Sequence, residues 1–488
     1  MKRRQILQYS GSSVAAIALS RCSRPPTEPV QTIRLRSQSG SFVVDLTAAE
    51  QSLTVAGQSA QLLAYNRQVP GPLWEMQAGD TVQVNFTNHL ADPTNLHFHG
   101  LHIPPNGHAD NVFLSVPPGE QQQYQFMIAP DHPVGLFWYH PHHHGLVAEQ
   151  VFGGLAGPII VRGAVDQIPE IQAATESILV LQDFDLNRRG RRREPMPMFR
   201  RWGREGTLIT VNGDRAPTVT IPQRGLLRLR LLNASPSRIY QLRLNGHPWY
   251  LIGMDGGTLS EPVELTNDLV LAPGNRADVL VAGDQNPGTY SLVSLPYDRG
   301  ISDMMAGMGH SVHLHRPGEM VAIAQLHYGE TIHEIPLPST LLASPMLPPP
   351  SRRREFVLDH GIDGAQSFLI NGLGFAPGRI DTSVELGTVE EWCSINNAVR
   401  DHPFHLHTNA FQVIRRNGEP VPLTVWQDVV NVKAYETVDI LVSFNDYAGK
   451  TVYHCHILDH EDQGMMGIIE MRAPTVSASD SNSSVILA

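Results

Sequence analysis

Cysteine is scarce in this 488-residue chain, which has only Cys22, Cys393 and Cys455. Three widely separated cysteines exclude a disulfide-dense scaffold. They also exclude a zinc finger or an iron–sulfur site, because such sites need closely paired cysteines. Charged residues make up 17% of the chain and hydrophobic residues 41%. This composition is typical of a folded globular protein and not of a disordered chain.

An excess of positive charge is also missing, since the net charge is −11. A nucleic-acid partner is therefore not expected. Beyond the N-terminus no apolar run is long enough for a transmembrane helix, so no stable membrane span is expected. At roughly 150 residues per domain, the length predicts about three domains.

The first residues have the features of a targeting segment. "MKRRQILQYSGSSVAAIALSRC" begins with basic residues, and its apolar run at 13–19 is too short to cross a bilayer. Arg3-Arg4 followed by Ile6-Leu7 resembles a twin-arginine signal, and an ordinary secretory signal is the alternative. We expect residues 1–28 to direct export to the periplasm or the cell exterior. Lipid attachment at Cys22 stays open, although the preceding Arg21 argues against it.

Most of the remaining chain alternates between apolar and polar residues. "DTVQVNFTN" (80–88), "LLRLRLLNAS" (226–235) and "DVVNVKAY" (428–435) have the period of two that is typical of half-buried strands. Long stretches with helical periodicity are scarce. The sequence therefore predicts an all-β protein built from β-sandwiches.

An internal repeat indicates three such sandwiches. Stretches that start at Tyr65, Val211 and Ile370 each contain an asparagine, a turn with proline, an extended run and a strand that ends near another asparagine. The first asparagines are 146 and 159 residues apart, and each interval fits one sandwich. A proline-rich linker and a flexible tail complete the predicted organisation. The predicted domains are 30–165, 174–330 and 355–475, with the linker at 331–354 and the tail at 476–488.

The 23 histidines are clustered. Random placement would give about one H-x-H pair, whereas six occur. Four segments carry most of them: "HFHGLH" (97–102), "WYHPHHHG" (138–145), "HPFHLH" (402–407) and "HCHILDHEDQGM" (454–465). The first two lie in the first repeat and the last two in the third. A shared site would therefore form where the first and third domains meet.

Strand geometry sorts these residues into two sets, because residues i and i+2 of a strand share a face. One set has eight imidazoles, which suits a cluster of metal ions such as copper. Its members are His97, His99, His140, His142, His405, His407, His454 and His456. The other set combines His402, Cys455, His460 and Met465, which is the ligand combination of a blue-copper electron-transfer site. Cys455 stands between His454 and His456 and so connects the two sets.

These four segments are similar to the copper-binding motifs of the three-domain multicopper oxidases, the laccase-like family. The resemblance implies three consecutive cupredoxin-like Greek-key β-sandwiches and four copper ions. It also implies that electrons from a reductant pass from the type 1 copper to a trinuclear cluster that reduces O2 to water. The implied type 1 ligands are His402, Cys455, His460 and Met465, with Met465 axial; the type 2 ligands are His97 and His405; and the type 3 ligands are His99, His140, His142, His407, His454 and His456.

Two acidic residues resemble parts of the family's proton route. Asp110 follows His97 by thirteen residues, and Glu461 directly follows His460. A positioned carboxyl group is a suitable proton relay to a site that reduces oxygen. The alternative is that each is a loop acid or accepts a backbone N–H.

The resemblance implies oxidation of phenols or aromatic amines by a monomeric enzyme. The alternative is oxidation of Cu(I) for copper homeostasis, because thioethers select Cu(I) and "DMMAGMGHSVHLH" contains Met304, Met305, Met308 and His310 as a candidate substrate-copper site. Alternatively, these methionines pack a loop and bind no copper. The stretch "NNAVRD" before His402 lacks the methionine of the known cuprous oxidases and has Arg400. A copper-free structural scaffold would have gaps in the ligand set, and there are none.

Overall fold

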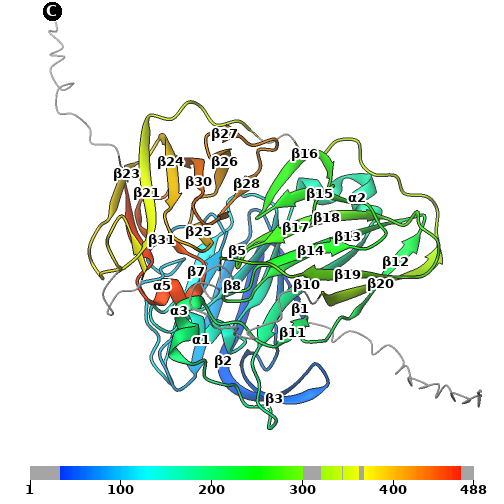
Figure 1. The fold of residues 1–488 in the computed structure, drawn as a ribbon, viewed down its shortest axis with the longest axis horizontal. Helices are drawn as coiled ribbons and strands as arrows, with labels where there is room; N and C mark the ends of the chain where they lie inside the picture. Colours follow the sequence, from blue (N-terminus) through cyan, green and yellow to red (C-terminus); the bar gives the residue numbers. More distant parts are fainter. Residues whose placement is uncertain (1–32, 301–319, 343–344, 362–367, 474–488) are drawn as a thin grey trace, which may run out of the picture.

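The computed structural model describes residues 33–300, 320–342, 345–361 and 368–473. Figure 1 shows three β-rich regions that follow one another along the chain. Their strands fall within 34–162, 175–331 and 352–472. The predicted all-β, cupredoxin-like fold class is confirmed. The expected export signal, the expected tail and the methionine-rich segment with Met304, Met305, Met308 and His310 lie outside the described residues.

The first region has two facing sheets. One has the strand order β1(Arg34–Arg36), β4(Leu73–Gln77), β9(Gly157–Arg162), β8(Gly135–His140) and β6(His97–His99). The other has the order β3(Gln58–Tyr65), β2(Ser41–Val55), β5(Thr81–His89) and β7(Gln121–Met127). In β5 the buried and less buried residues alternate, as the sequence predicts.

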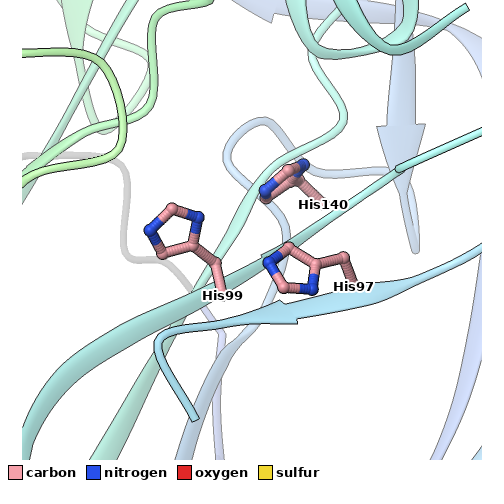
Figure 2. A group of neighbouring side chains, drawn as sticks. All are labelled: His97, His99 and His140. Carbon is pink, nitrogen blue, oxygen red and sulfur yellow. The ribbon is translucent and has the colours of Figure 1, made fainter. Parts of the chain in front are cut away.

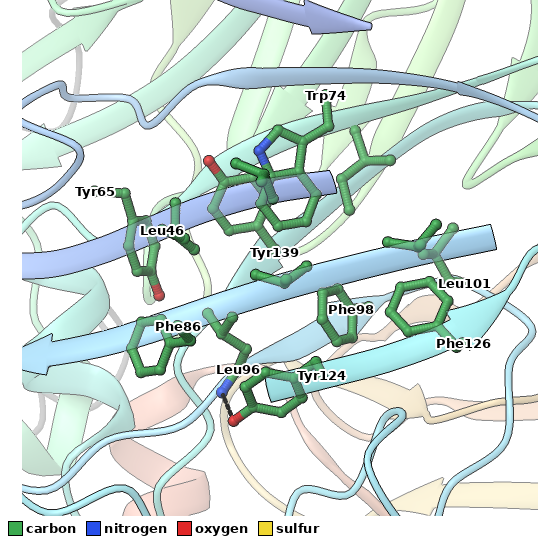
Figure 3. Packing of buried hydrophobic residues seen from close by; sticks show 14 of the residues in the cluster. Leu46, Tyr65, Trp74, Phe86, Leu96, Phe98, Leu101, Tyr124, Phe126 and Tyr139 are labelled. Atoms are coloured by element: carbon green, nitrogen blue, oxygen red, sulfur yellow. Dashed lines mark hydrogen bonds between the residues drawn. The ribbon is translucent and has the colours of Figure 1, made fainter. Parts of the chain in front are cut away.

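The core of this region fixes the start of β6. Figure 3 shows aromatic rings filling the space between the two sheets, with Trp74 stacked on Tyr139 at 4.0 Å between ring centres. The Tyr124 hydroxyl accepts a hydrogen bond from the backbone N–H of Leu96 at 3.0 Å. Because Leu96 directly precedes His97, this core contact sets where the histidines of β6 lie.

The second region also has two sheets. The first has the order β11(Leu208–Val211), β10(Thr175–Phe184), β13(Leu226–Asn233), β18(Arg276–Ala282), β15(Trp249–Met254) and β16(Gly257–Glu264). The second has the order β12(Thr218–Gln223), β20(Val321–Thr331), β19(Thr289–Leu295), β14(Tyr240–Leu244) and β17(Leu269–Leu271). Every residue of β13 is buried, so its alternating sequence places arginines as well as leucines inside.

The third region repeats the plan. One sheet has the order β22(Phe368–Ile370), β21(Arg352–His360), β24(Thr388–Asn396), β30(Thr437–Phe444), β26(Phe411–Arg416) and β27(Glu419–Pro420), and β28(Trp426–Gln427) also pairs with β26. The other has the order β23(Thr382–Glu385), β32(Met466–Arg472), β31(Gly449–Cys455), β25(His402–Leu406) and β29(Val429–Val432).

The repeated asparagines have the same local structure in all three regions. Asn66, Asn212 and Asn371 have φ values of 47°, 52° and 53°, a left-handed conformation that asparagine tolerates better than most residues. Each side chain bonds twice to the strand beside it. The amide oxygens accept from the backbone N–H of Thr47, Val180 and Val357, and the amide nitrogens donate to the backbone oxygens of Asp45, Ile178 and Glu355.

The helices are short. They are α1(Val147–Phe152), α2(Pro169–Ala173), α3(Pro197–Trp202) and α5(Leu458–Asp462), with a 3-10 turn η1(Ala164–Gln167). Helix α5 packs against α1 of the first region and α3 of the second, so all three regions meet next to the "HCHILDHEDQGM" segment. Among the residues that the structure describes, no helix is both long and apolar enough to span a membrane.

Candidate metal centre

The predicted histidine and cysteine ligands lie on or just after four strands, except His460, which lies on helix α5. His97 of β6 pairs in register with His140 of β8, and His405 of β25 pairs with His454 of β31. The two strand pairs come from the first and third regions and bring their histidines together. Figure 2 shows three of these rings, those of His97, His99 and His140, close to one another. All eight histidines of the predicted imidazole cluster are buried.

The imidazole cluster divides into subgroups. The Nε2 atom of His454 lies 3.2 Å from Nε2 of His142 and 3.0 Å from Nε2 of His407. Metal–nitrogen bonds of about 2.0 Å place two ligand nitrogens roughly 3 Å apart, so these three rings could share one ion. A second subgroup has ring centres 4.9 to 5.8 Å apart. It consists of His99, His140 and His456. The remaining rings are those of His97 and His405.

Unpartnered ring nitrogens test whether metal ions fit this cluster. Within the described chain, the Nε2 atoms of His97, His140, His405 and His456 have no hydrogen-bond partner, and neither do the Nδ1 atoms of His99 and His407. Burial lowers the pKa of all eight imidazoles, so they are neutral at pH 7 and offer lone pairs. Buried nitrogens without partners are unfavourable, and imidazole-binding metal ions would satisfy them.

The outer nitrogens of several rings are held by hydrogen bonds. The Nδ1 atom of His405 donates to the backbone oxygen of Asp428 at 2.7 Å, and Nδ1 of His140 donates to that of Pro141 at 2.9 Å. Such bonds fix the tautomer and turn the lone pair of Nε2 inward. The cluster is therefore preorganised for metal binding.

The second predicted set also comes together. The Cys455 Sγ atom lies 3.4 Å from Nδ1 of His402 and 3.7 Å from Nδ1 of His460, and the two nitrogens are 3.3 Å apart. All three side chains are completely buried. Burial raises the pKa of the Cys455 thiol, so only a bound cation would make the thiolate favourable there. Two imidazoles and one thiol at this spacing fit a blue-copper site.

Met465 is placed by backbone contacts. Its oxygen accepts a hydrogen bond from the N–H of Cys455 at 3.0 Å, and its N–H donates to the oxygen of His460 at 2.9 Å. Its side chain is fully buried in the core of the third region, which also includes Cys455. These contacts hold the backbone of Met465 next to Cys455 and His460, and its thioether would be the weak fourth ligand that the sequence predicts.

Aromatic side chains cover the Cys455 site. The ring of Phe368 stacks on that of His460 at 3.9 Å between centres, and His360 lies 5.5 Å from His402. His402 and His460 are both 0% exposed. His360 lies outside the four histidine-rich segments, and nothing in its sequence neighbourhood marks it as part of a site. Burial and the nearby charge of Arg400 lower the pKa of His360 to about 4.

Both acids of the predicted proton route are buried beside the imidazole cluster. Asp110 accepts from Nδ1 of His97 and from the N–H of Phe98, each at 2.9 Å, and burial raises its pKa to about 7. Glu461 lies 3.5 Å from Nε2 of His142 and 3.3 Å from Nδ1 of His454. Burial raises the pKa of Glu461 well above its usual value. Neither acid is a surface residue.

An arginine of the second region supports the imidazole cluster, and sequence analysis did not identify it. Arg276 of β18 forms two hydrogen bonds with the Asp428 carboxylate, at 2.7 and 2.6 Å, and Asp428 accepts from Nε2 of His99 at 2.9 Å. Gly274, with φ +86°, packs against the same rings. A Cβ at this position would lie only 3.0 Å from the rings of His456 and His99, so a larger residue would crowd them. The available sequence signal was a charged residue within an otherwise apolar strand, in "GNRADVLV" (274–281) and "WQDVVNV" (426–432).

Comparison with known proteins agrees with this geometry. Sequence profiles described as multicopper oxidase match residues 47–165, 131–313 and 347–474. The chain belongs to the multicopper oxidase family. A Campylobacter jejuni multicopper oxidase, described as a metallo-oxidase, has a similar structure, with a TM-score of 0.81 and 28% identity over 92% of this chain and 96% of that one. A laccase from Pediococcus acidilactici has a TM-score of 0.77 and 28% identity, over 92% of this chain and 94% of that one.

The similar sequences are named either multicopper oxidase or cell division protein FtsP. The multicopper oxidase mco of Staphylococcus haemolyticus is 29% identical over 425 residues, which are 84% of this chain and 83% of the relative. The cell division protein FtsP of Photorhabdus laumondii is 30% identical over 483 residues, which are 95% and 97% of the two chains. Family membership implies copper binding and oxidoreductase chemistry.

Arg276→Met is expected to destabilise the protein and to lower its copper content. It leaves the buried Asp428 carboxylate without its cation, and breaking a buried ion pair costs about 3–5 kcal/mol. Urea unfolding of the copper-free protein and copper per chain after loading measure the two effects. The control is Arg224→Met, which removes an exposed ion pair with Glu334. Wild-type values for Arg276→Met would contradict the supporting role.

Proposed function

We propose that this protein is a laccase-like oxidase that couples one-electron oxidation of phenols or aromatic amines to four-electron reduction of O2 to water. The observation that carries the proposal is the position of Cys455. Its thiol lies between His402 and His460, while its neighbours His454 and His456 belong to the imidazole cluster. Three consecutive residues thus connect an electron-transfer site with a site of several metal ions.

We assign four copper ions to these residues, one of type 1, one of type 2 and two of type 3. Bound copper would supply the one-electron steps and the oxygen chemistry, which side chains alone do not provide. The proposed type 1 ligands are His402, Cys455, His460 and Met465; those of type 2 are His97 and His405; those of type 3 are His99, His140, His142, His407, His454 and His456. The close approach of the ring nitrogens of His142, His407 and His454 supports one group of three in this assignment.

The protein holds the connection between the two sites rigid. The N–H of His456 donates to the oxygen of Pro403 at 2.7 Å, and that of Cys455 donates to Met465. Cys455 and both flanking histidines are 0% exposed. A short, dry and covalent path between the sites favours electron transfer within the protein over loss of electrons to solvent.

Glu461 and Asp110 are proposed to deliver protons to the imidazole cluster. Glu461→Gln keeps the shape of the side chain but cannot release a proton, and a positioned acid or base contributes about 10²–10⁴-fold to a rate. We expect oxygen uptake to fall by roughly 100-fold or more, with the blue absorption unchanged. The exposed Glu264→Gln is the control. An uptake rate for Glu461→Gln within twofold of wild type would rule out the relay.

The reductant is proposed to be an organic molecule that binds over the aromatic cover of the Cys455 site. Because the ring of Phe368 lies on His460, an electron from a phenol would cross this ring. The positive charge of Arg400 next to this cover disfavours a cation such as Cu(I). Similarity to the Pediococcus acidilactici laccase is in keeping with an organic reductant.

Cu(I) oxidation is the second candidate. The thioethers of Met304, Met305 and Met308, with His310, favour it, and so does similarity to the Campylobacter jejuni metallo-oxidase. Oxygen uptake by the copper-loaded protein separates the candidates. Fast uptake with 2,6-dimethoxyphenol and no added copper would support the laccase-like activity. Uptake with Cu(I), and with the phenol only after copper is added, would support cuprous oxidation.

A copper-free structural role is the remaining alternative, and the name of the FtsP relatives, cell division protein, does not state an oxidase activity. Against it stand the complete ligand set and the number of buried ring nitrogens without partners. We also propose export by the twin-arginine route, on the sequence features of residues 1–28, and a monomeric state, which the family resemblance implies.

A further inference from the structure

We propose that the buried positive charge of Arg400, which pairs with no carboxylate among the described residues, raises the reduction potential of the type 1 copper. This inference rests on the proposed function, since it requires copper at His402, Cys455 and His460. It assigns a tuning role to a residue that is not among the proposed copper ligands.

The loop that carries Arg400 is fixed in place. It joins β24 to β25, and Arg400 comes two residues before His402. The side-chain amide of Asn396 donates to the backbone oxygen of Arg400 at 2.7 Å. Gly300 packs so tightly on this loop that a Cβ there would lie 1.9 Å from the backbone oxygen of Val399. The position of the charge is therefore well defined.

The guanidinium group lies on the aromatic cover of the type 1 site. Its Cζ atom is 3.9 Å from the ring centre of Trp202 and 5.9 Å from that of Phe368, the ring that stacks on His460. One of its terminal N–H groups donates to the backbone oxygen of Arg201 at 2.5 Å. Arg400 is only 7% exposed, and its Nε has no partner within the described residues.

This charge differs from the other buried arginines near the site. Arg204 pairs with Asp459, Arg276 with Asp428, and Arg299 with Glu205 at 3.1 Å. In the part of the chain that the structure describes, no carboxylate pairs with Arg400. Its nearest carboxylate in sequence, Asp401, accepts instead from Tyr297 and Asn431 at 2.6 and 2.7 Å.

The other charges around Arg400 do not cancel it. Arg201 and Arg299 add positive charge near it, and an arginine guanidinium group is protonated at neutral pH. The Asp359 carboxylate accepts a hydrogen bond from the backbone N–H of His360 at 2.7 Å and interacts electrostatically with that imidazole. An unpaired cation in a dry place is unfavourable for folding. A loss of folding stability of this kind is expected mainly at positions where function requires the charge.

The effect on copper follows from electrostatics. Reduction removes one positive charge from the type 1 site. A nearby fixed cation in a medium of low dielectric constant therefore favours the reduced form and raises the potential. The ligands, including axial Met465, set the base value, and Arg400 adds to it.

Arg400→Gln tests this inference in the copper-loaded full-length protein. Redox titration of the blue band should show at least a tenfold loss in the equilibrium constant for reduction by a one-electron mediator, which corresponds to 59 mV. Arg400→Lys should stay within threefold of wild type. Arg201→Gln removes a neighbouring but exposed charge and should also stay within threefold, because water screens it. A blue Arg400→Gln protein within twofold of wild type would overturn the inference.

A second pair of variants keeps Arg400 in place. Trp202→Glu puts a carboxylate against the guanidinium, and Trp202→Gln is its uncharged control. The potential of Trp202→Glu should be lower than that of Trp202→Gln, and equal potentials would contradict the tuning role even if Arg400→Gln fails to fold. If the wild-type protein itself binds copper without a blue band, the proposed function is wrong. If the band is present and the potentials do not respond, only this inference is wrong.

Discussion

Cys455→Ser is expected to abolish both the blue absorption and oxygen uptake while the chain stays folded. The thiolate is the source of the thiolate-to-copper absorption and the start of the covalent path to His454 and His456. Serine is of nearly the same size, and its hydroxyl is a poor ligand at neutral pH. The backbone bonds from Cys455 to Met465 and from His456 to Pro403 do not depend on the side chain. Absorption, oxygen uptake and circular dichroism measure the three properties.

Cys393→Ser is the matched control for this experiment. Cys393 is also buried, at 1% exposure, and lies in β24 of the third region. Its strand, β24, belongs to one sheet of the third region, whereas the histidine-bearing strands β25 and β31 belong to the other. Its variant should remain blue and active. A blue Cys455→Ser protein would rule out the type 1 assignment.

The double variant His99→Ala/His456→Ala is expected to separate the two sites. The two rings lie 4.9 Å apart, and their unpartnered nitrogens belong to the same subgroup of the imidazole cluster. Their loss removes two of the three proposed ligands of one type 3 ion, and oxygen reduction should fall below detection. The side chains of His402 and Cys455 are unchanged, so the blue band should persist and should bleach with a reductant without recovering in air.

Two exposed histidines provide the control for the double variant. His89→Ala/His327→Ala removes the same number of imidazoles outside the cluster and should behave as wild type. Continued oxygen uptake by His99→Ala/His456→Ala would show that the assignment of the imidazole cluster is wrong.

Local patterns were sufficient to predict the parts of the site that are encoded within single strands. Alternation placed His405 and His407 on one face and His402 on the other, and the structure brings them to two different groups. The repeated Asn66, Asn212 and Asn371 indicated three similar units because each has to adopt the same left-handed turn. These inferences required only contacts between residues close in sequence.

Contacts between distant residues could not be predicted in the same way. Arg276 and Asp428 are 152 residues apart, and neither neighbourhood shows that they bind each other beside His99. The second region, which carries none of the twelve proposed ligands, thus still supports the imidazole cluster. Likewise, the burial of Arg400 depends on Trp202 of helix α3, from another region of the chain. Packing between distant segments decides which charged side chains become buried, and the periodicity of a single segment gives no information about that packing.

Copper content is the most direct test of the central claim that this chain holds both a type 1 site and a trinuclear cluster. The purified protein would be loaded with copper, freed of loosely bound ions, and measured for copper per chain together with its absorption spectrum. The account predicts four copper ions per chain and an intense blue band that disappears on reduction and returns in air. A folded protein that retains no copper, or that retains copper without a blue band, would contradict it.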